Sequence, residues 1–550
     1  MRRLREWPKL TEPELIIASA ILLILAFIQC YLCTHDLFWA YGPDYDRDIG
    51  LIQSSLEGHY GKDPNFAGEY IWYNPLIYSI ETIVVKITDL PISVVVTRIG
   101  TYLNLLSPIA LYIMTYVLFD VRIATASLLS FLFFATGNMP AWGAATYSPW
   151  IGADSFMQFL FYLNIIFTYK AFSLQKNFWF FILGSSLGIC FLGHTAPTVL
   201  SILILATLQS ANIFNAWRDK RYEAIKKCLL QSIIAFTPFV LVASPFLYII
   251  ILKYHLQFRN HFILEFSNGI FHVSNWRQII KENLSISFIV SIIGFVWFWK
   301  NIKNVLIRKI IFAWLFWSVF MYVYTTCIPK VYHVLNIQLP DTVSAFHYFF
   351  YLKALQSVFF GFGFVFLFQT AYLLIDRQIL KKLRNSLPRV TANSMFFIVV
   401  LTSAILYYPK YKERKDFVEL REQAISKQNE KDKIEVYRFI VQNIPSGMVI
   451  LCEHDLSTFP VMATGRKMVS IESTFTNPYL DYEERESARE QMLLFLRDGK
   501  PTALKKLFED YQVSFILLSN EELNTYNALS TEISQVVFKN ESYTLFALSM

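Results

Sequence analysis

The chain has 550 residues, of which 55% are hydrophobic, 17% are aromatic and only 17% are charged. Soluble globular proteins carry about 25% charged residues, so this composition excludes an ordinary cytosolic enzyme, a secreted disulfide module and a disordered scaffold. The net charge of +7 does not indicate a nucleic-acid partner, because Lys and Arg occur in short clusters between apolar runs. Such clusters are typical of membrane proteins, where they orient the helices.

Apolar runs long enough to cross a bilayer recur along the first 409 residues. The run at residues 15–33 is expected to form the first transmembrane helix. Further spans are expected to be centred near Leu105, Leu128, Tyr162, Leu183, Ile202, Phe239, Ile292, Trp317, Phe362 and Val399. The pattern predicts a polytopic α-helical membrane protein with about eleven transmembrane helices over residues 1–409.

The basic residues predict the orientation of these spans. Clusters of Lys and Arg occupy alternate loops, at residues 2–9, 122, 170–176, 218–227, 300–309 and 377–389. By the positive-inside rule the N-terminus is then cytoplasmic, and an odd number of spans places residues 410–550 outside. We expect a multi-pass protein of the plasma (inner) membrane.

Two segments on the expected outer side are unusual. The first outer loop, residues 35–91, is rich in Asp, Tyr, Gly and Pro, and its apolar stretch 76–87 carries Glu81 and Lys86. The second, residues 253–283, mixes aromatic residues with histidines. Both contain stretches that are expected to lie along the membrane surface.

The composition changes at about residue 410, where charges become frequent and mixed. Amphipathic helical patterns at residues 431–443, 482–497 and 503–511 alternate with short apolar runs at 448–451, 515–518, 536–537 and 545–548. This alternation predicts a small extracytoplasmic α/β domain over residues 410–550.

The first outer loop opens with an acidic motif, Asp-Tyr-Asp-Arg-Asp, at residues 44–48. Pro43 suits the first turn of a helix, and a helix from here to about residue 57 places Asp44 and Asp48 on one face with Arg47 beside them. The alternative is a solvated, well-capped helix start. Three acids within five residues favour a functional role, because they repel one another unless a cation or a proton-transfer task occupies them.

Four more ionisable residues lie where outer loops enter spans: Asp154, His194, His347 and Lys353. Each has a structural alternative, such as a helix cap for Asp154 or snorkelling for Lys353. Together they can converge on an outward-facing cavity that suits a phosphorylated lipid and an acceptor hydroxyl. An ion path is disfavoured because the middles of the spans are nearly free of charge.

The layout resembles the GT-C integral-membrane glycosyltransferases, and most closely the branch of protein O-mannosyltransferases and aminoarabinose transferases of lipid A. That family begins with one span and a long outer loop opening on an acidic motif and, a few residues later, a glycine, matched here by residues 44–48 and Gly58. Its P-L-Y-Y-like segment corresponds to residues 73–78, although Tyr73 stands where Lys or His is common. Tyr45 replaces the Glu of the family's Asp-Glu form.

The resemblance extends to the later loops. Asp154 falls where the family has a second acidic residue, and residues 194–197 correspond to its L-x-H-P-like turn at His194. Residues 346–348 correspond to an R-F-like motif, with His347 where Arg is usual.

The resemblance implies transfer of a sugar from a polyprenyl- or dolichyl-phosphate donor to a hydroxyl of a glycan, lipid or protein at the outer face, with inversion. Asp44 is the expected general base, and Asp154 is a second catalytic candidate. The candidate ligands of the lipid phosphate are Arg47, His194, His347 and Lys353, and Asp46, Asp48 and Tyr73 complete the expected substrate-binding set.

No metal and no other cofactor are expected, because the leaving phosphate is already carried by the lipid. Two alternatives remain open. A polysaccharide polymerase or O-antigen ligase is also polytopic but lacks the early acidic loop. A lipid-linked sugar transporter or flippase is disfavoured by the scarcity of charge within the spans.

Overall fold

The computed structural model describes residues 13–134, 145–260, 275–337, 339, 343–375, 392–526 and 534–548. The predicted basic clusters at 2–9 and 377–389, and residues 261–274 of the predicted interfacial segment, lie outside the described residues. The chain forms two compact units. The helical unit comprises Met1–His35, Gly100–Ala243 and Ser267–Glu419, and the mixed unit comprises Asp36–Ile99, Ser244–Phe266 and Leu420–Met550.

Long apolar helices build the helical unit. They are α1 (Pro13–Thr34), α5 (Leu106–Leu118), α6 (Val121–Leu129) continued by η2 (Ser130–Phe134), α7 (Ala153–Leu174), α8 (Asn177–Gly193), α9 (Thr195–Arg218), α10 (Tyr222–Leu247), α13 (Ile286–Asn301), α14 (Val305–Leu335), α15 (Phe346–Ile375) and α17 (Ala392–Lys412). The last residues of α10, from Ser244, and the following η4 (Tyr248–Lys253) belong to the mixed unit. The short helix α12 (Trp276–Asn283) precedes α13, and α4 (Ile92–Leu103) precedes α5.

These helices confirm a multi-pass membrane protein. Among the described residues, seven helical segments are long and apolar enough to cross a membrane: Pro13–Thr34, Ile92–Leu118, Thr195–Arg218, Tyr222–Lys253, Val305–Leu335, Phe346–Leu374 and Ala392–Gln428. Three shorter apolar helices, Val121–Phe134, Asn177–Gly193 and Ile286–Asn301, add to them. With α7, whose buried face includes the polar Gln158 and Asn164, these segments coincide with the eleven predicted spans.

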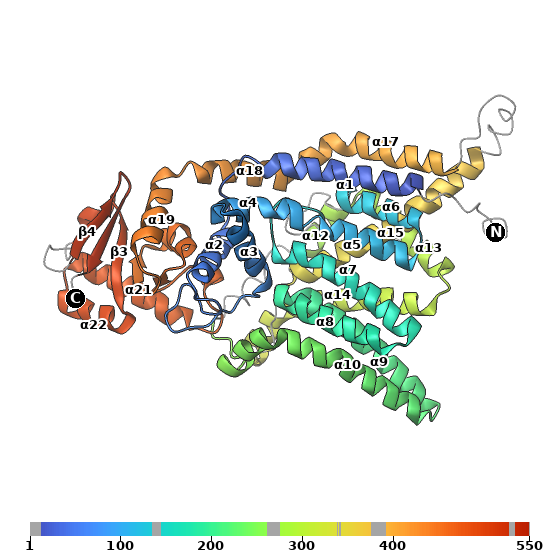
Figure 1. Cartoon of the computed structure of the whole chain (residues 1–550), viewed down its shortest axis with the longest axis horizontal. Helices are drawn as coiled ribbons and strands as arrows, with labels where there is room; N and C mark the ends of the chain where they lie inside the picture. The colour runs from blue at the N-terminus through green and yellow to red at the C-terminus, as the bar shows by residue number, and fades with distance from the viewer. Residues whose placement is uncertain are drawn as a thin grey trace. The chain divides into compact units, whose positions relative to one another are not determined.

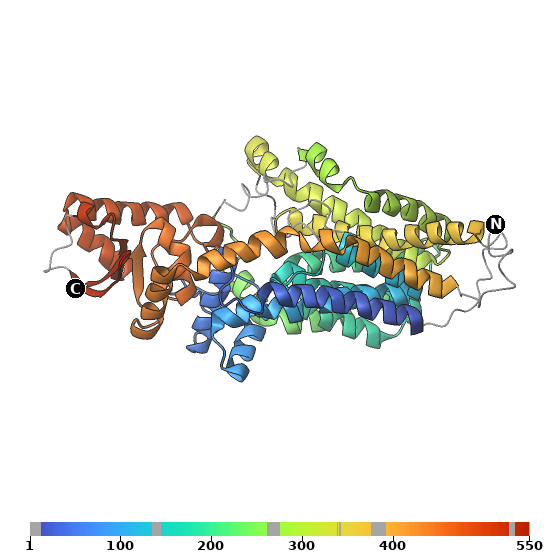
Figure 2. The same ribbon diagram turned by 90° about the horizontal axis from the view of Figure 1, so that it is seen from above.

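Small residues let neighbouring helices approach closely. A Cβ atom on Gly294 of α13 would collide with the carbonyl oxygen of Phe359 in α15, and one on Gly363 would collide with that of Val290. The two backbones therefore touch, as is common where helices pack in a membrane. Figures 1 and 2 both show α1 lying along α17.

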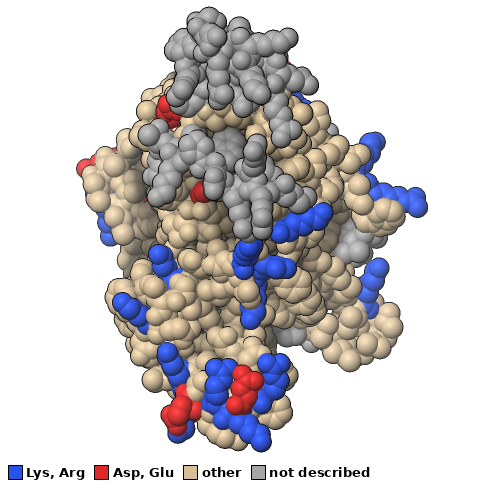
Figure 3. Space-filling model, turned by 90° about the vertical axis from the view of Figure 1, so that its right-hand side faces the viewer, with Lys and Arg blue, Asp and Glu red and all other residues tan. Residues whose placement is uncertain are grey.

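Basic side chains gather at one end of the helical unit. Figure 3 looks onto this end, where Lys and Arg side chains lie over the turns between helices and few acids are visible. The turn from α9 to α10 contributes ion pairs there, between Arg221 and Asp219 and between Lys226 and Glu223. The arrangement agrees with the alternation of basic loops in the sequence.

The mixed unit is built around a five-stranded sheet with strand order β2-β1-β3-β5-β4. Its strands are β1 (Val449–Cys452), β2 (Lys467–Met468), β3 (Val513–Ser519), β4 (Ser534–Lys539) and β5 (Tyr543–Leu548). Strand β1 pairs in parallel with β2 and β3, whereas β5 pairs antiparallel with β3 and β4. Leu451 lies opposite Ile516, and Leu517 lies opposite Leu545.

Helices cover both faces of this sheet. Helices α21 (Tyr482–Asp498) and α22 (Pro501–Tyr511) pack on the face that includes Leu451 and Leu518. Helix α19 (Lys431–Asn443) packs with the segment Ser457–Thr464 on the face that includes Ile450 and Leu517. Alternate residues of one strand thus serve two separate cores, and the α/β architecture predicted for the C-terminal part is confirmed.

The first outer loop packs against this domain within the mixed unit. Its helices are α2 (Pro43–Leu56) and α3 (Leu76–Thr88). Gly50 of α2 lies so close to the carbonyl oxygen of Met462 that a Cβ atom there would collide with it. The predicted boundary at residues 409/410 stays a prediction, and α17 runs through it to Lys412.

Candidate active site

Helix α2 begins where the sequence predicts. Gly42 precedes it with φ of +119°, a conformation that favours glycine, and Pro43 occupies the first helical position. The carboxylates of Asp44 and Asp48 lie one turn apart, with Arg47 between them. The expected juxtaposition of these three side chains is therefore present.

Arg47 connects the two carboxylates. Its Nη1 atom donates to Asp44 Oδ1 at 2.7 Å, and its Nε atom donates to Asp48 Oδ1 at 2.9 Å. The guanidinium lies 3.7 Å from the centre of the Tyr73 ring, a cation–π contact. The Arg47 side chain is 9% exposed, whereas that of Asp44 is 66% exposed. A buried cation thus holds an accessible carboxylate in place.

Burial dominates the electrostatics of this group. Desolvation raises the pKa of Asp48 to about 6, with Arg47 lowering it and Asp44 raising it. Desolvation alone would lower the pKa of Arg47, but Asp48, Tyr73 and Asp44 outweigh it and raise that pKa, so the guanidinium stays charged. Glu81 of α3 is fully buried nearby. Desolvation raises the pKa of Glu81 well above its usual range, and the negative charge of Asp48 raises it further.

Asp46 is paired with a different cation, Lys427. Lys427 Nζ donates to both of its carboxylate oxygens, at 2.6 and 2.7 Å, and Trp39 Nε1 donates at 3.3 Å. Desolvation raises the pKa of Asp46, while Lys427 and Trp39 oppose the rise. A substrate contact from Asp46 stays a prediction. The sequence did not indicate Lys427 as the partner of Asp46, because it lies 381 residues further along the chain.

In the helical unit, the structure brings Asp154, His194 and His347 to one end of the bundle. The rings of His194 and His347 lie 4.7 Å apart, which joins the start of α9 to the start of α15. Asp154 Oδ1 accepts a hydrogen bond from the Ser155 amide at 2.7 Å in the first turn of α7. His194 Nδ1 accepts one from the Ala196 amide at 3.2 Å and so caps α9.

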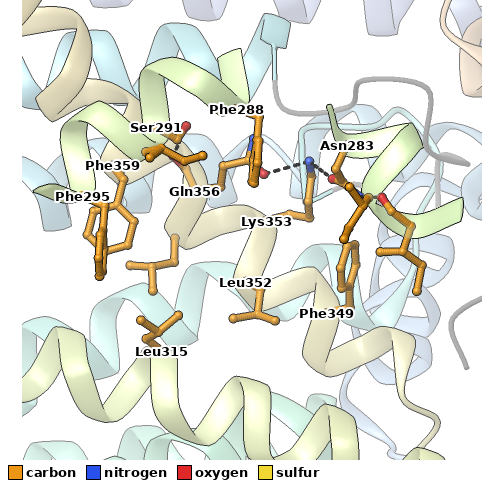
Figure 4. Close-up of a pocket in the computed structure, with 14 residues that line it drawn as sticks. Asn283, Phe288, Ser291, Phe295, Leu315, Phe349, Leu352, Lys353, Gln356 and Phe359 are labelled. Carbon is orange, nitrogen blue, oxygen red and sulfur yellow. Dashed lines mark hydrogen bonds between the residues drawn. The ribbon is translucent and has the colours of Figure 1, made fainter. Parts of the chain in front are cut away.

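Lys353 is buried two turns into α15 and is 4% exposed. Its ammonium group donates to Asn283 Oδ1 at 2.6 Å and to Gln356 Oε1 at 3.0 Å (Figure 4). Both partners are neutral amides, and no described carboxylate lies within ion-pairing distance of Lys353. The sequence did not indicate Asn283 and Gln356, because the candidate site residues were recognised by their charge and an amide is neutral.

An apolar cavity of about 390 Å³ adjoins this ammonium group. It lies between α12, α13, α14 and α15, and the side chains around it are mostly aromatic and aliphatic (Figure 4). They include Phe288, Phe295, Leu315, Phe349, Leu352 and Phe359. The cavity falls within the size range of small-molecule sites. One cation on an apolar wall matches an amphiphile with an anionic head group.

Within the described ranges, no group of three or more His, Cys, Asp or Glu side chains lies close enough to hold a metal ion. The expectation that the chain needs no metal stays a prediction.

No family model and no curated protein matches the sequence. Solved structures match the structure of this chain. ArnT from Cupriavidus metallidurans bound to undecaprenyl phosphate matches with a TM-score of 0.55 at 12% identity, over 98% of this chain and 98% of that chain. The oligosaccharyltransferase of Archaeoglobus fulgidus in the apo form matches with a TM-score of 0.53 at 12% identity, over 94% of this chain and 70% of that chain.

The chain has the fold of these two solved structures. The resemblance seen in the sequence is thus confirmed at the level of the fold. At 12% identity the match concerns the fold alone, and activity and substrate depend on this chain's own side chains.

Proposed function

We propose that this protein transfers a sugar from a polyprenyl-phosphate donor to an acceptor hydroxyl at the outer face of the membrane, with inversion at the anomeric carbon. The observation that carries the proposal is Lys353, a buried ammonium group on the wall of an apolar cavity whose partners among the described residues are two amides. A lipid phosphate supplies both the apolar chain and the anion that such a site lacks. The solved ArnT structure with the same fold holds undecaprenyl phosphate, which supports this class of donor.

The mixed unit supplies the acid–base group of the proposal. Asp44 is accessible and is held by Arg47, so its carboxylate can accept the proton of an acceptor hydroxyl as that oxygen attacks the anomeric carbon. The bond from that carbon to the phosphate breaks, and the leaving phosphate keeps the electron pair. Attack from the side opposite the phosphate inverts the anomeric centre.

Asp154, His194 and His347 are the proposed contributors from the helical unit. The paired imidazole rings can donate hydrogen bonds to phosphate oxygens, and Asp154 can accept one from the acceptor. The N-terminus is placed in the cytoplasm in this proposal, because the basic turns gathered at one end of the helical unit then face inward.

Lipid binding tests the donor site directly. Purified protein in detergent is titrated with undecaprenyl phosphate and with undecaprenol, and its melting temperature is followed. We expect the phosphate to raise the melting temperature of the wild type more than the alcohol does, because Lys353 pairs with the anion. In Lys353→Gln the two lipids should act alike.

Lys300→Gln is the matched control, because Lys300 is an exposed lysine near the end of the neighbouring helix α13. This variant should keep the wild-type preference for the phosphate. Two results would contradict the proposed donor site. One is an equal rise in the melting temperature of the wild type with both lipids, and the other is an unchanged preference for the phosphate in Lys353→Gln.

A further inference from the structure

Glu81 of α3 is buried without a partner. Its side chain has no exposed surface, and neither carboxylate oxygen has a hydrogen-bond partner among the described residues. Ionised carboxylates are almost never buried unless they are paired, because the loss of hydration is costly. In the charged form, Glu81 would therefore be strongly unfavourable at this position.

The charges around Glu81 do not compensate it. Helix α3 packs against α2, and the charged groups that act on Glu81 are Asp48 and Arg47. Those that act on Asp48 are Arg47, Asp44 and Asp46. Arg47 is the only cation of this set, and its hydrogen bonds go to Asp44 and Asp48.

The described cation that acts on Asp46 is already engaged. Lys427 is paired with Asp46 through both carboxylate oxygens. One guanidinium then faces three carboxyl groups, those of Asp44, Asp48 and Glu81. Glu81 is the most deeply buried of the three and makes no hydrogen bond, so it is the group that keeps its proton most strongly. The raised pKa of Glu81 agrees with this reasoning.

We propose that Glu81 is a positioning residue that carries a proton at neutral pH, and that its neutral carboxyl leaves Arg47 free to hold Asp44 and Asp48. The effect on sugar transfer rests on the proposed function, whereas the protonation state of Glu81 does not. When Glu81 loses its proton to water at high pH, a third anion competes for Arg47. The carboxylate of Asp44 then loses the contact that orients it.

Infrared spectroscopy of the purified protein tests the protonation state. At about pH 7 an ordinary Asp or Glu is ionised, so a protonated carboxylic acid gives a separate carbonyl absorption. We expect the wild type to show one such contribution that is missing from Glu81→Gln. It should remain in Glu483→Gln, which removes an exposed carboxyl of α21.

Two infrared results would overturn the inference. One is a wild-type spectrum that loses all carbonyl absorption of protonated acids at about pH 7, a measurement that depends on no variant. The other is a difference spectrum in which Glu81→Gln matches the wild type while Asp48→Asn lacks the contribution, which would assign the proton to Asp48.

The pH profile of transfer tests the positioning role. The wild type should lose rate as the pH rises into the alkaline range, and Glu81→Gln should keep a constant rate over that range because its amide cannot ionise. The same alkaline loss in both proteins would contradict the role. If the wild type shows no sugar transfer at all, the proposed function fails while the infrared result still decides whether Glu81 holds a proton.

Discussion

Two buried cations, one in each unit, have opposite surroundings. Arg47 in the mixed unit is 7% exposed and donates to two carboxylates. Lys353 in the helical unit is 4% exposed and donates to two neutral amides. Because a buried charge without a counter-ion is unfavourable, an incoming anion is stabilised more at Lys353 than at Arg47.

The comparison separates roles that the sequence had grouped together. Arg47 and Lys353 are both candidates for the lipid phosphate when only residue types are considered. In the structure the carboxylates of Asp44 and Asp48 already compensate Arg47. We therefore assign Arg47 to the orientation of the proposed base and Lys353 to the donor.

The largest effect is expected for Asp44→Asn. The amide cannot accept the acceptor's proton, so the rate of sugar transfer should fall by roughly 10²–10⁴ with little change in melting temperature. The measurement is release of prenyl phosphate from a panel of prenyl-phosphate sugars by the protein in membranes. Asp89→Asn, an exposed position of the same outer loop, is the control. Activity within a few-fold of the wild type would move the base to Asp48 or Asp154.

Arg47→Gln should resemble Asp44→Asn rather than a donor-site variant. The glutamine cannot bridge Asp44 and Asp48, so kcat should fall by roughly ten- to a hundred-fold, since a charge-assisted hydrogen bond contributes about 1.5–3 kcal/mol. The KM for the donor should change little. A large rise in donor KM without a fall in kcat would place Arg47 on the phosphate and abolish the division.

Lys353→Ala should raise the KM for the lipid-phosphate sugar by about ten-fold, because it removes one charge-assisted contact. The KM for the acceptor should stay near that of the wild type. If the contact strengthens as charge develops on the leaving phosphate, kcat falls as well. If Lys353→Ala changes neither the KM values for the two substrates nor kcat, Lys353 does not bind the donor.

The smallest effect concerns stability and pH. The pKa of Asp48 is raised to about 6, so the folded state binds this proton more tightly than the unfolded chain does. The contribution of Asp48 to the free energy of unfolding is therefore greatest in acid and is lost as the pH rises from about 4 to about 6. The melting temperature of Asp48→Asn should vary less over this window than that of the wild type. Parallel curves for the two proteins would contradict the raised pKa.

The sequence predicted the elements far better than their partners. Apolar runs near Phe239 and Phe362 identify spans because hydropathy is a local property, and the helix at residues 431–443 follows from its amphipathic pattern. Pro43 likewise predicted the start of α2. Each of these features depends on residues within a few turns of one another.

The partners of the site residues depend on the fold. Lys427 meets Asp46 across 381 residues, and Asn283 meets Lys353 across 70. The local periodicity of a sequence does not indicate such distant pairs. The sequence also shows Glu81 as a charged residue in an apolar stretch, but only the packing of α3 on α2 shows that its carboxyl is buried and unpaired.

The long separation between the first outer loop and its partners has a consequence for biosynthesis. Asp46, Glu57 and Asp63 find Lys427, Arg466 and Asn477 only 381, 409 and 414 residues later. At 5–20 residues per second a ribosome needs on the order of 20–80 s to supply them. During that interval the loop is already translated but lacks the side chains that complete it. The loop therefore completes these contacts only after residue 477 has been translated, and a nascent chain stalled before residue 427 cannot form the ion pair between Asp46 and Lys427.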